Sequence, residues 1–202
     1  MSLVRRCVLL ALLLVMGLSC SNSAPPAEEP PLLMAFTLSP HLLGESFSLA
    51  EPAFSFQAPA GWDKVDSTRL GQLAGLLRED QDQSVILNLE AVFLNARQGC
   101  TLVLSRWQSD SVRTWREEER RQRQRLDERF AGKALQHATY LLQDQLCLQS
   151  LVQDSLIVNF KLMLANGLLL DFLVPRQIYE TQVELIESSL GSMSFPSTST
   201  PE

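Results

Sequence analysis

The segment between residues 135 and 174 restricts the fold more than any other feature of the sequence. It contains four apolar stretches, separated only by the short polar connections "QDQ", "QD" and "ANG". Connections of two or three residues join antiparallel neighbours, whereas parallel strands need long crossovers. The segment therefore predicts a four-stranded meander, with strands near 135–142, 145–152, 155–164 and 168–174.

The last connection, "ANG", also predicts the register of the final hairpin. A two-residue Asn-Gly turn would place Leu162 opposite Asp171, an apolar side chain opposite a charged one. A three-residue turn with Gly167 in the left-handed conformation places Leu162 opposite Leu170 instead. The same register brings Lys161 opposite Asp171 on the other face of the sheet. Because it satisfies both faces, we expect the three-residue turn.

The sequence before the meander contains an aromatic strand at 54–57 and a stretch, 83–107, that fits two interpretations. Its alternating apolar residues fit a strand, and the same run fits a buried helix. We expect a helix up to about Glu90, followed by a hairpin with strands near 91–95 and 100–107.

Three further helices are expected, and together with the meander they define the fold class. Helical spacing and N-capping residues place one at 67–80, capped by Ser67 or Thr68, and one at 110–130, capped by Ser109 or Asp110. The third carries the apolar stripe Tyr179, Val183, Ile186 and Leu190. Apolar residues on both faces of the meander indicate that helices cover both sides. We expect an α+β fold, an α/β/α sandwich with a central, mainly antiparallel sheet.

The first twenty residues, "MSLVRRCVLLALLLVMGLSC", have the layout of an export signal: two arginines, an apolar run and small residues. The apolar run is too short to span a bilayer of about 30 Å as a helix. Its end, "MGLSC", resembles a bacterial lipoprotein signal, in which Cys20 would become the lipid-modified first residue. Ordinary cleavage near Ser19 to Ala24 is the alternative. If the host is Gram-negative, Ser21 after the cysteine resembles the pattern of lipoproteins that go to the outer membrane, on its periplasmic side.

This signal sets the expected domain organisation. We expect a signal peptide at 1–19, a lipidated cysteine with a disordered tether at 20–44, one domain at 45–195 and a disordered tail at 196–202. The full chain has 17 basic and 23 acidic residues, a net charge of −6. Loss of Arg5 and Arg6 with the signal leaves 15 against 23, a net charge of −8. Such a balance argues against general nucleic-acid binding.

Of the four cysteines, two remain after processing and lipidation, Cys100 and Cys147. In an exported protein they are a candidate disulfide, with two free core thiols as the alternative. There is no Cys-x-x-Cys motif to suggest redox chemistry.

Two separate motifs, together with the late strand that runs into "DFLVPRQIY", resemble one family. "FSFQAPAGW" supplies an aromatic strand followed by Pro-x-Gly-Trp, and "ELIESSLGSMSF" supplies a helix with Ile-x-x-Ser that leads to Ser-Phe. The residues that carry the resemblance are Phe54, Phe56, Pro59, Gly61, Trp62, Ile186, Ser189, Ser194 and Phe195. Over about 45–195 the chain resembles the PsbP-like bacterial lipoproteins and periplasmic proteins, DcrB-like proteins among them. The resemblance implies an α/β/α sandwich and an accessory or binding role rather than a catalytic one.

Motifs for catalysis and metal binding are absent from the sequence. It contains no Gly-x-Ser-x-Gly, no Ser-x-x-Lys and no glycine-rich phosphate loop. His41 and His137 have no partners at zinc-site spacing. One polar group remains a candidate for ligand binding: Lys161 with Asp171, joined by Asn159, beneath a helix. An exposed cross-strand ion pair is the alternative.

These observations lead to three functional hypotheses. The first is a non-enzymatic, lipid-anchored envelope protein that binds another envelope protein or assembly, in addition to the membrane through Cys20. The second is a carrier of a small ligand, which would use a cleft between the sheet and the helices. The third is an enzyme of unknown class. We expect no cofactor, no metal and no nucleic-acid partner.

Overall fold

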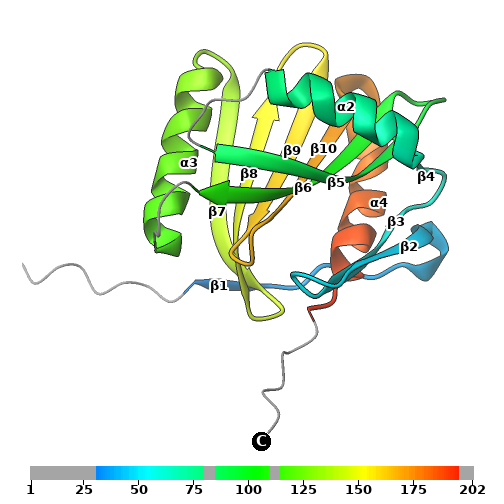
Figure 1. Ribbon diagram of the computed structural model, residues 1–202, viewed down its shortest axis with the longest axis horizontal. Helices are drawn as coiled ribbons and strands as arrows, with labels where there is room; N and C mark the ends of the chain where they lie inside the picture. The colour runs from blue at the N-terminus through cyan, green and yellow to red at the C-terminus, as the bar shows by residue number, and fades with distance from the viewer. Residues whose placement is uncertain (1–30, 80–84, 110–113, 196–202) are drawn as a thin grey trace, which may run out of the picture. The chain divides into compact units, whose positions relative to one another are not determined.

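An eight-stranded sheet organises residues 31–79, 85–109 and 114–195, the part of the chain that the computed structural model describes. Its strands lie in the order β1-β7-β8-β9-β10-β6-β5-β4 (Figure 1). Only the pairing of β1 with β7 is parallel. The strands are β1 Leu32–Met34, β4 Asp63–Lys64, β5 Val85–Asn95, β6 Cys100–Ser109, β7 Ala134–Leu142, β8 Gln145–Gln153, β9 Ile157–Leu164 and β10 Leu168–Pro175. The expected α+β class with a mainly antiparallel sheet is confirmed.

The predicted meander and its register are also confirmed. β7 to β10 follow one another as antiparallel neighbours. In the last hairpin Leu162 pairs with Leu170, and Lys161 pairs with Asp171. Gly167 has a φ of +90°, a backbone conformation that residues with a Cβ rarely adopt. The three-residue turn therefore depends on glycine at this position.

The helix expected up to Glu90 is wrong, because β5 is a strand from Val85 to Asn95. It pairs with β6 along its whole length, and a bulge interrupts the register between Leu89 and Ala91. Leu89 lies opposite Ser105, whereas Ala91 lies opposite Leu104, so the bulge moves the apolar residues from one face to the other. Because the face changes within one strand, the apolar residues of β5 do not keep a strict alternation in the sequence. A buried helix also lacks this alternation, so the two could not be told apart.

The domain begins earlier than residue 45. β1 forms the edge of the sheet and pairs with β7, and a short 3-10 helix, η1 Pro40–Leu42, connects it to β2, Leu43–Leu49. β2 and β3, Phe54–Pro59, form a separate two-stranded sheet. The tether predicted for 20–44 is therefore wrong over 32–44, because Met34 and Phe36 pack against the core. Residues 1–30, with the predicted signal and Cys20, lie outside the described residues.

In the part of the chain that the structure describes, three α-helices cover the sheet. α2, Ser67–Glu79, and α3, Trp115–Arg129, lie on one side, and α4, Tyr179–Gly191, lies on the other (Figure 1). Their starts differ from the predictions. Asp66 caps α2, since its Oδ1 accepts from Thr68 N and Arg69 N at 3.0 Å each. Thr114 caps α3 in a capping box with Glu117. Within the described ranges, no helix has the length and apolarity needed to cross a membrane.

The two family-like motifs contact each other directly. Ser189 Oγ donates to Gln57 O at 2.6 Å, and Ser192 Oγ accepts from Gln57 N at 2.8 Å. Ser194 forms an antiparallel bridge with Ser55. Nearby, the rings of Phe54 and Phe195 lie 5.6 Å apart, and Trp62 is buried against Phe172. The serines of the second motif therefore attach α4 to the backbone of β3, and the aromatic residues of both motifs extend the core.

Candidate functional site

The alternation of side chains divides the meander into two chemically different faces. In β9, Phe160 and Leu162 face α4, where they join the apolar core, while Asn159 and Lys161 face the other side. The same division continues across the neighbouring strands, because Phe160 pairs with Phe172 and Lys161 pairs with Asp171. We call these the α4 face and the α3 face.

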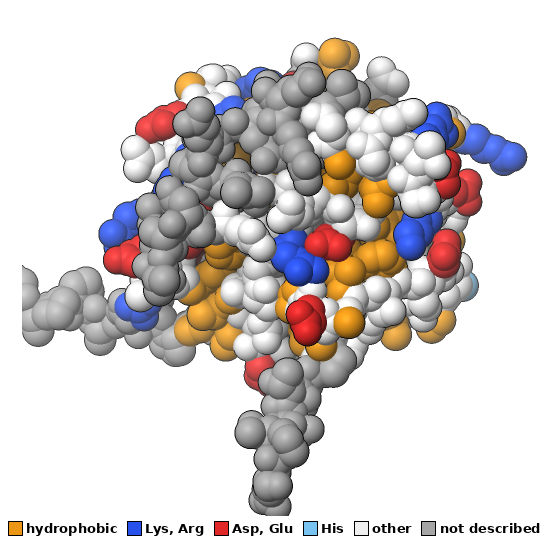
Figure 2. Space-filling view, viewed as in Figure 1, with side chains coloured by type: hydrophobic (Ala, Val, Ile, Leu, Met, Phe, Trp, Pro, Cys, Tyr) orange, Lys and Arg blue, Asp and Glu red, His pale blue; other side chains and the backbone are white. Residues whose placement is uncertain are grey.

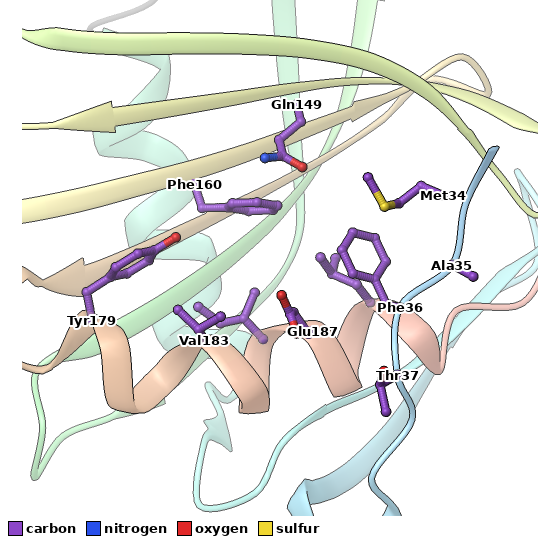
Figure 3. Close-up of a pocket in the computed structure, with 11 residues that line it drawn as sticks. Met34, Ala35, Phe36, Thr37, Gln149, Phe160, Tyr179, Val183 and Glu187 are labelled. Carbon is purple, nitrogen blue, oxygen red and sulfur yellow. The ribbon is translucent and has the colours of Figure 1, made fainter. Parts of the chain in front are cut away.

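A cavity of about 320 Å³ lies on the α4 face, between the helix and the sheet (Figure 3). Its volume is at the lower end of the range for small-molecule sites, about 300–1,000 Å³. Slightly more than half of its wall is apolar, and the large apolar side chains are those of Met34, Phe36, Phe160, Val183, Ile186 and Leu190. Such a wall favours a ligand with an apolar body.

Four polar residues also line this cavity. Thr37 lies in the N-terminal segment, Gln149 on β8, and Tyr179 and Glu187 on α4. Figure 3 shows Gln149 descending from the sheet and Glu187 rising from the helix towards the space between them. Few polar groups in a mainly apolar wall are the usual means by which a site orients its ligand.

Hydrogen bonding and burial keep two tyrosine side chains at or near the cavity, Tyr140 and Tyr179, protonated. Tyr140 Oη donates to Gln149 Oε1 at 2.9 Å, so the amide is fixed and its Nε2 is the end that remains for a ligand. Burial raises the pKa of Tyr140, which keeps this donor protonated. Burial and, secondarily, the Glu187 carboxylate raise the pKa of Tyr179, which also stays a neutral phenol.

The N-terminal segment forms one wall of the cavity, with lining residues from Met34 to Thr37. Three contacts hold it in place. β1 pairs with β7, and Ser39 N donates to the buried Ser188 Oγ at 3.2 Å. A Cβ on Gly191 would lie 3.0 Å from Phe36 O, so glycine allows the close approach of the segment to α4. The residues expected to be a tether thus complete the cavity.

The structure does not bring the predicted ligand residues to this cavity. Lys161 and Asp171 form an ion pair on the α3 face, and their side chains are 17% and 18% exposed. Asn159 lies on the same face, and its Oδ1 and Asp171 Oδ1 are buried with no hydrogen-bond partner among the described residues. The ion pair itself is as predicted, but it is largely buried rather than exposed. Ligand binding by these three residues remains a prediction.

Lys161 and Asp171 continue a row of polar side chains across four strands of the α3 face. His137 pairs with Ser150, Ser150 with Lys161, and Lys161 with Asp171. His137 Nδ1 lies 2.8 Å from Ser150 Oγ, and its Nε2 lies 3.5 Å from Asp127 Oδ1 on α3. An Asp-His-Ser set is a familiar arrangement for activating a nucleophile. Here Ser150 is only 1% exposed, so no substrate reaches its hydroxyl.

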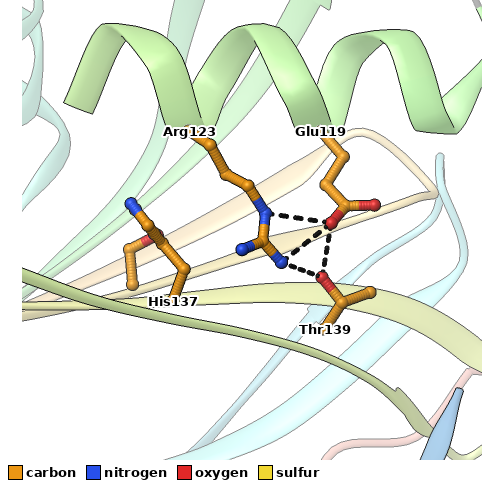
Figure 4. Close-up of polar contacts among 5 residues, drawn as sticks. Glu119, Arg123, His137 and Thr139 are labelled. Carbon is orange, nitrogen blue, oxygen red and sulfur yellow. Dashed lines mark hydrogen bonds and ion pairs between the residues drawn. The ribbon is translucent and has the colours of Figure 1, made fainter. Parts of the chain in front are cut away.

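A second polar contact attaches α3 to β7, two residues along the strand from His137 (Figure 4). Arg123 pairs with Glu119 at 2.9 Å and donates to Thr139 Oγ1 at 2.7 Å, and Thr139 donates to Glu119 Oε1 at 2.6 Å. Arg123 therefore pairs within the helix and docks onto β7. On the face drawn in Figure 2, basic and acidic side chains are likewise interspersed.

The candidate disulfide between Cys100 and Cys147 is wrong. Both are free, buried thiols, and β9 and β10 lie between their strands, so their Cα atoms are too far apart for a bond. Burial raises the pKa of Cys100 and raises that of Cys147 to about 12. Both are protonated at neutral pH and are poor nucleophiles. Across the described ranges, no three His, Cys, Asp or Glu side chains are grouped to hold a metal ion.

Sequence reasoning missed the polar residues of the cavity, although each leaves a signal. Gln149 interrupts an apolar alternation with Cys147 and Leu151 on β8. Glu187 stands four residues after Val183, at the border of the apolar stripe of α4. A polar residue on an apolar face indicates that its side chain has a buried polar partner or lines a cavity. The sequence does not show, however, that β8 and α4 lie against each other.

Comparison with known proteins adds a likeness of fold. No protein-family model matches the chain, and no curated protein does. Among solved structures, it is similar to the solution structure of cyanobacterial PsbP (CyanoP) from Synechocystis sp. PCC 6803. The two are 15% identical, and the match covers 85% of this chain and 99% of that chain with a TM-score of 0.44.

Proposed function

We propose that the protein is a non-enzymatic binding module of the bacterial envelope, anchored through a lipid on Cys20, that carries a small ligand in the cavity on the α4 face. The observation that supports ligand binding is the cavity itself, with a volume of about 320 Å³ and a wall that combines apolar side chains with four polar residues. On the α3 face, by contrast, the groups with nucleophile-like geometry are buried and inaccessible.

The anchor is supported by the sequence. The arginines, the short apolar run and "LSC" form a lipoprotein-like signal that ends at Cys20. Several acyl chains on one cysteine are sufficient for stable membrane attachment, whereas a single chain is marginal. From the motifs at 54–62 and 184–195 we propose a DcrB-like protein, and from Ser21 we propose the outer membrane as its destination if the host is Gram-negative.

Ligand binding is tested with 4-phenylbutan-1-ol, a neutral probe with an apolar body and a single hydroxyl. At about −0.3 kcal/mol per non-hydrogen atom, a probe of this size reaches a Kd in the millimolar range. Saturation-transfer NMR on the purified full-length chain measures such affinities. We expect Val183→Trp to fill the cavity and to reduce binding at least tenfold.

The matched control is Thr181→Trp, which adds the same indole to an exposed position of the same helix. It should bind the probe as the unmodified protein does, and thermal melting followed by circular dichroism verifies that both variants fold. Equal binding to Val183→Trp and the unmodified chain would refute the cavity as the binding site. Absence of binding to the unmodified chain would refute the carrier function.

The anchor has an independent test. Cys20→Ser should transfer the protein from the membrane fraction to the soluble fraction of cells that export it, because the modified thiol is lost. Cys7→Ser, which changes a cysteine within the predicted signal, should leave the fractionation unchanged. A Cys20→Ser protein that stays in the membrane fraction would contradict lipidation.

Binding of another envelope protein is a second candidate, favoured by the edge strand β1. Leu32 and Leu33 are 75% and 72% exposed on this strand, which follows directly after the proposed tether. An exposed apolar edge is a template for strand addition by a partner. In a crosslinking pulldown, Leu32→Lys with Leu33→Lys should lose partners that the unmodified chain captures, while Leu156→Lys at an exposed turn should retain them.

A further inference from the structure

We propose that the cavity selects an organic cation, a ligand that joins an ammonium group to an apolar or aromatic body. This inference rests on the proposed ligand-binding function and specifies its chemistry. It depends on three properties of the cavity. These are the negative charge of Glu187, the lack of a basic residue on α4 to pair with it, and the aromatic rings in the wall.

The first property is charge. Among the described residues that line the cavity, Glu187 is the one acid, and there is no lysine, arginine or histidine. An anionic ligand would have to lie beside this carboxylate without a basic side chain to bind it. A cationic group instead gains a charged partner, and a charge-assisted hydrogen bond is stronger than a neutral one.

The second property is the lack of a counter-ion for Glu187. α4 reads "YETQVELIESSLG", which contains three acids and no basic residue. Within the described ranges, the half-buried Glu187 has no ion pair with any other element. A carboxylate at the cavity wall without a counter-ion offers a ligand cation a charge-assisted contact.

The third property is aromatic. Phe36, Phe160 and Tyr179 all line the cavity, and Figure 3 shows Tyr179 and Phe160 at one end and Phe36 at the other, with Glu187 on the helix between them. Aromatic faces attract ammonium groups, most strongly where water is excluded. A carboxylate combined with aromatic walls is the complement of an ammonium ion on an apolar body.

A matched series of three probes tests the selection: 4-phenylbutylamine, 4-phenylbutan-1-ol and 4-phenylbutyrate. They share one apolar body and carry a cation, a neutral hydroxyl and an anion. In saturation-transfer titrations of the full-length chain at pH 7, we expect the amine to bind at least fivefold more tightly than the alcohol. The butyrate should bind at least tenfold more weakly than the amine.

Glu187→Gln identifies the residue responsible. This variant should bind the amine and the alcohol with equal affinity, while its affinity for the alcohol is unchanged. Glu184→Gln removes the same charge from an exposed position one turn earlier, and it should retain the full preference for the amine. The control separates a contact in the cavity from the general attraction of cations by an acidic protein.

The outcomes distinguish the two proposals. If the unmodified protein binds the alcohol but shows no preference for the amine, or if Glu187→Gln retains the preference, the selection of a cation is wrong and the carrier function stands. If none of the three probes binds, the carrier function itself fails. If Glu184→Gln loses the preference as fully as Glu187→Gln, the effect is a surface effect and the inference is overturned.

Discussion

The two faces of the central sheet come from the same strands and have opposite chemistry. On the α4 face, aromatic and aliphatic side chains such as Phe160, Phe172 and Leu162 are nearly all fully buried, and a cavity remains beside them. On the α3 face, a row of polar groups crosses four strands beneath a charged helix. The apolar face leaves space for a ligand, and the polar face fills its space with its own partners.

This difference shows that polar residues do not by themselves indicate a binding site. Lys161 pairs with one oxygen of Asp171, and His137 lies between Ser150 and Asp127. On the α4 face Glu187 is a single charge in an apolar wall. A polar group that already has a partner contributes specificity of packing, whereas one that lacks a partner is available for a ligand.

The largest expected effect comes from truncating the apolar face. Phe172→Ala should lower the free energy of unfolding by about 3–5 kcal/mol, because it removes a fully buried ring that contacts Trp62 and Phe160. Leu173→Ala, the adjacent position on the α3 face, is half-buried and should cost about 1–2 kcal/mol. Urea denaturation followed by circular dichroism measures both. Equal losses would contradict the difference in packing between the faces.

The polar face should respond differently to single and double changes. Asp171→Ala leaves the Lys161 ammonium largely buried without its partner, and we expect a loss of about 2 kcal/mol. Lys161→Met combined with Asp171→Leu replaces both charges with apolar groups and should be within about 1 kcal/mol of the unmodified protein.

The double variant also tests whether the polar face takes part in ligand binding. Because the ion pair lies on the side of the sheet away from the cavity, its affinity for 4-phenylbutylamine should match that of the unmodified chain. A large loss of affinity in a stably folded double variant would restore Lys161 and Asp171 as ligand residues.

The sequence predicts local pairing well and long-range contact poorly, for physical reasons. The register of β9 and β10 could be predicted because it depends on residues close to the turn. Gly167 allows the turn, and the pairing of Leu162 with Leu170 lies a few residues from it. β5 could not be assigned, because its bulge exchanges the faces that the apolar pattern depends on. The parallel pairing of β1 with β7 depends on contacts about a hundred residues apart.

The candidate site illustrates the same limit. The cavity exists only because α4 packs over a distant sheet and the segment at Phe36 closes one side. Each residue that lines the cavity is of an ordinary type for the strand, helix or segment in which it lies. The predicted site residues, by contrast, were neighbours in one hairpin, which is why sequence reasoning found them and missed the cavity.

A smaller effect is expected where the N-terminal segment meets the helix. Gly191→Ala places a Cβ 3.0 Å from Phe36 O, so the wall of the cavity must shift by a few tenths of an ångström. Alanine favours a helix over glycine by up to about 1 kcal/mol, and this gain offsets the contact. We therefore expect little change in melting temperature and a two- to fivefold loss of affinity for 4-phenylbutan-1-ol.

Gly75→Ala in α2 is the matched control, since its added Cβ meets nothing within 4 Å. It should raise the stability by about 0.5–1 kcal/mol and leave probe binding unchanged. If Gly191→Ala gains the same stability and retains full affinity, the N-terminal segment does not form a wall that the ligand senses.

The smallest effect lies at the turn that joins β8 to β9, and it should disappear in acid. Asp154 Oδ1 accepts from Leu156 N at 2.7 Å and from Ile157 N at 3.0 Å, and Oδ2 pairs with Lys133 at 3.0 Å. The two backbone hydrogen bonds, and secondarily Lys133, lower the pKa of this carboxyl from 3.8 to about 2. Since the folded pKa is the lower one, the stabilisation is complete above about pH 4 and disappears as the pH falls towards 2.

Asp154→Asn retains an acceptor oxygen but removes the charge. Its melting temperature should lie slightly below that of the unmodified protein at pH 6, and the two should converge at pH 2, as measured by circular dichroism across this range. Asp144→Asn is the control. It removes one charge from the exposed turn between β7 and β8, where the carboxylate has no hydrogen bonds like those of Asp154, and its effect on the melting temperature should not change between pH 6 and pH 2. If the melting temperatures of Asp154→Asn and the unmodified protein still differ at pH 2, the charge of Asp154 does not stabilise the turn between β8 and β9. The difference would then come from the geometry of the side chain.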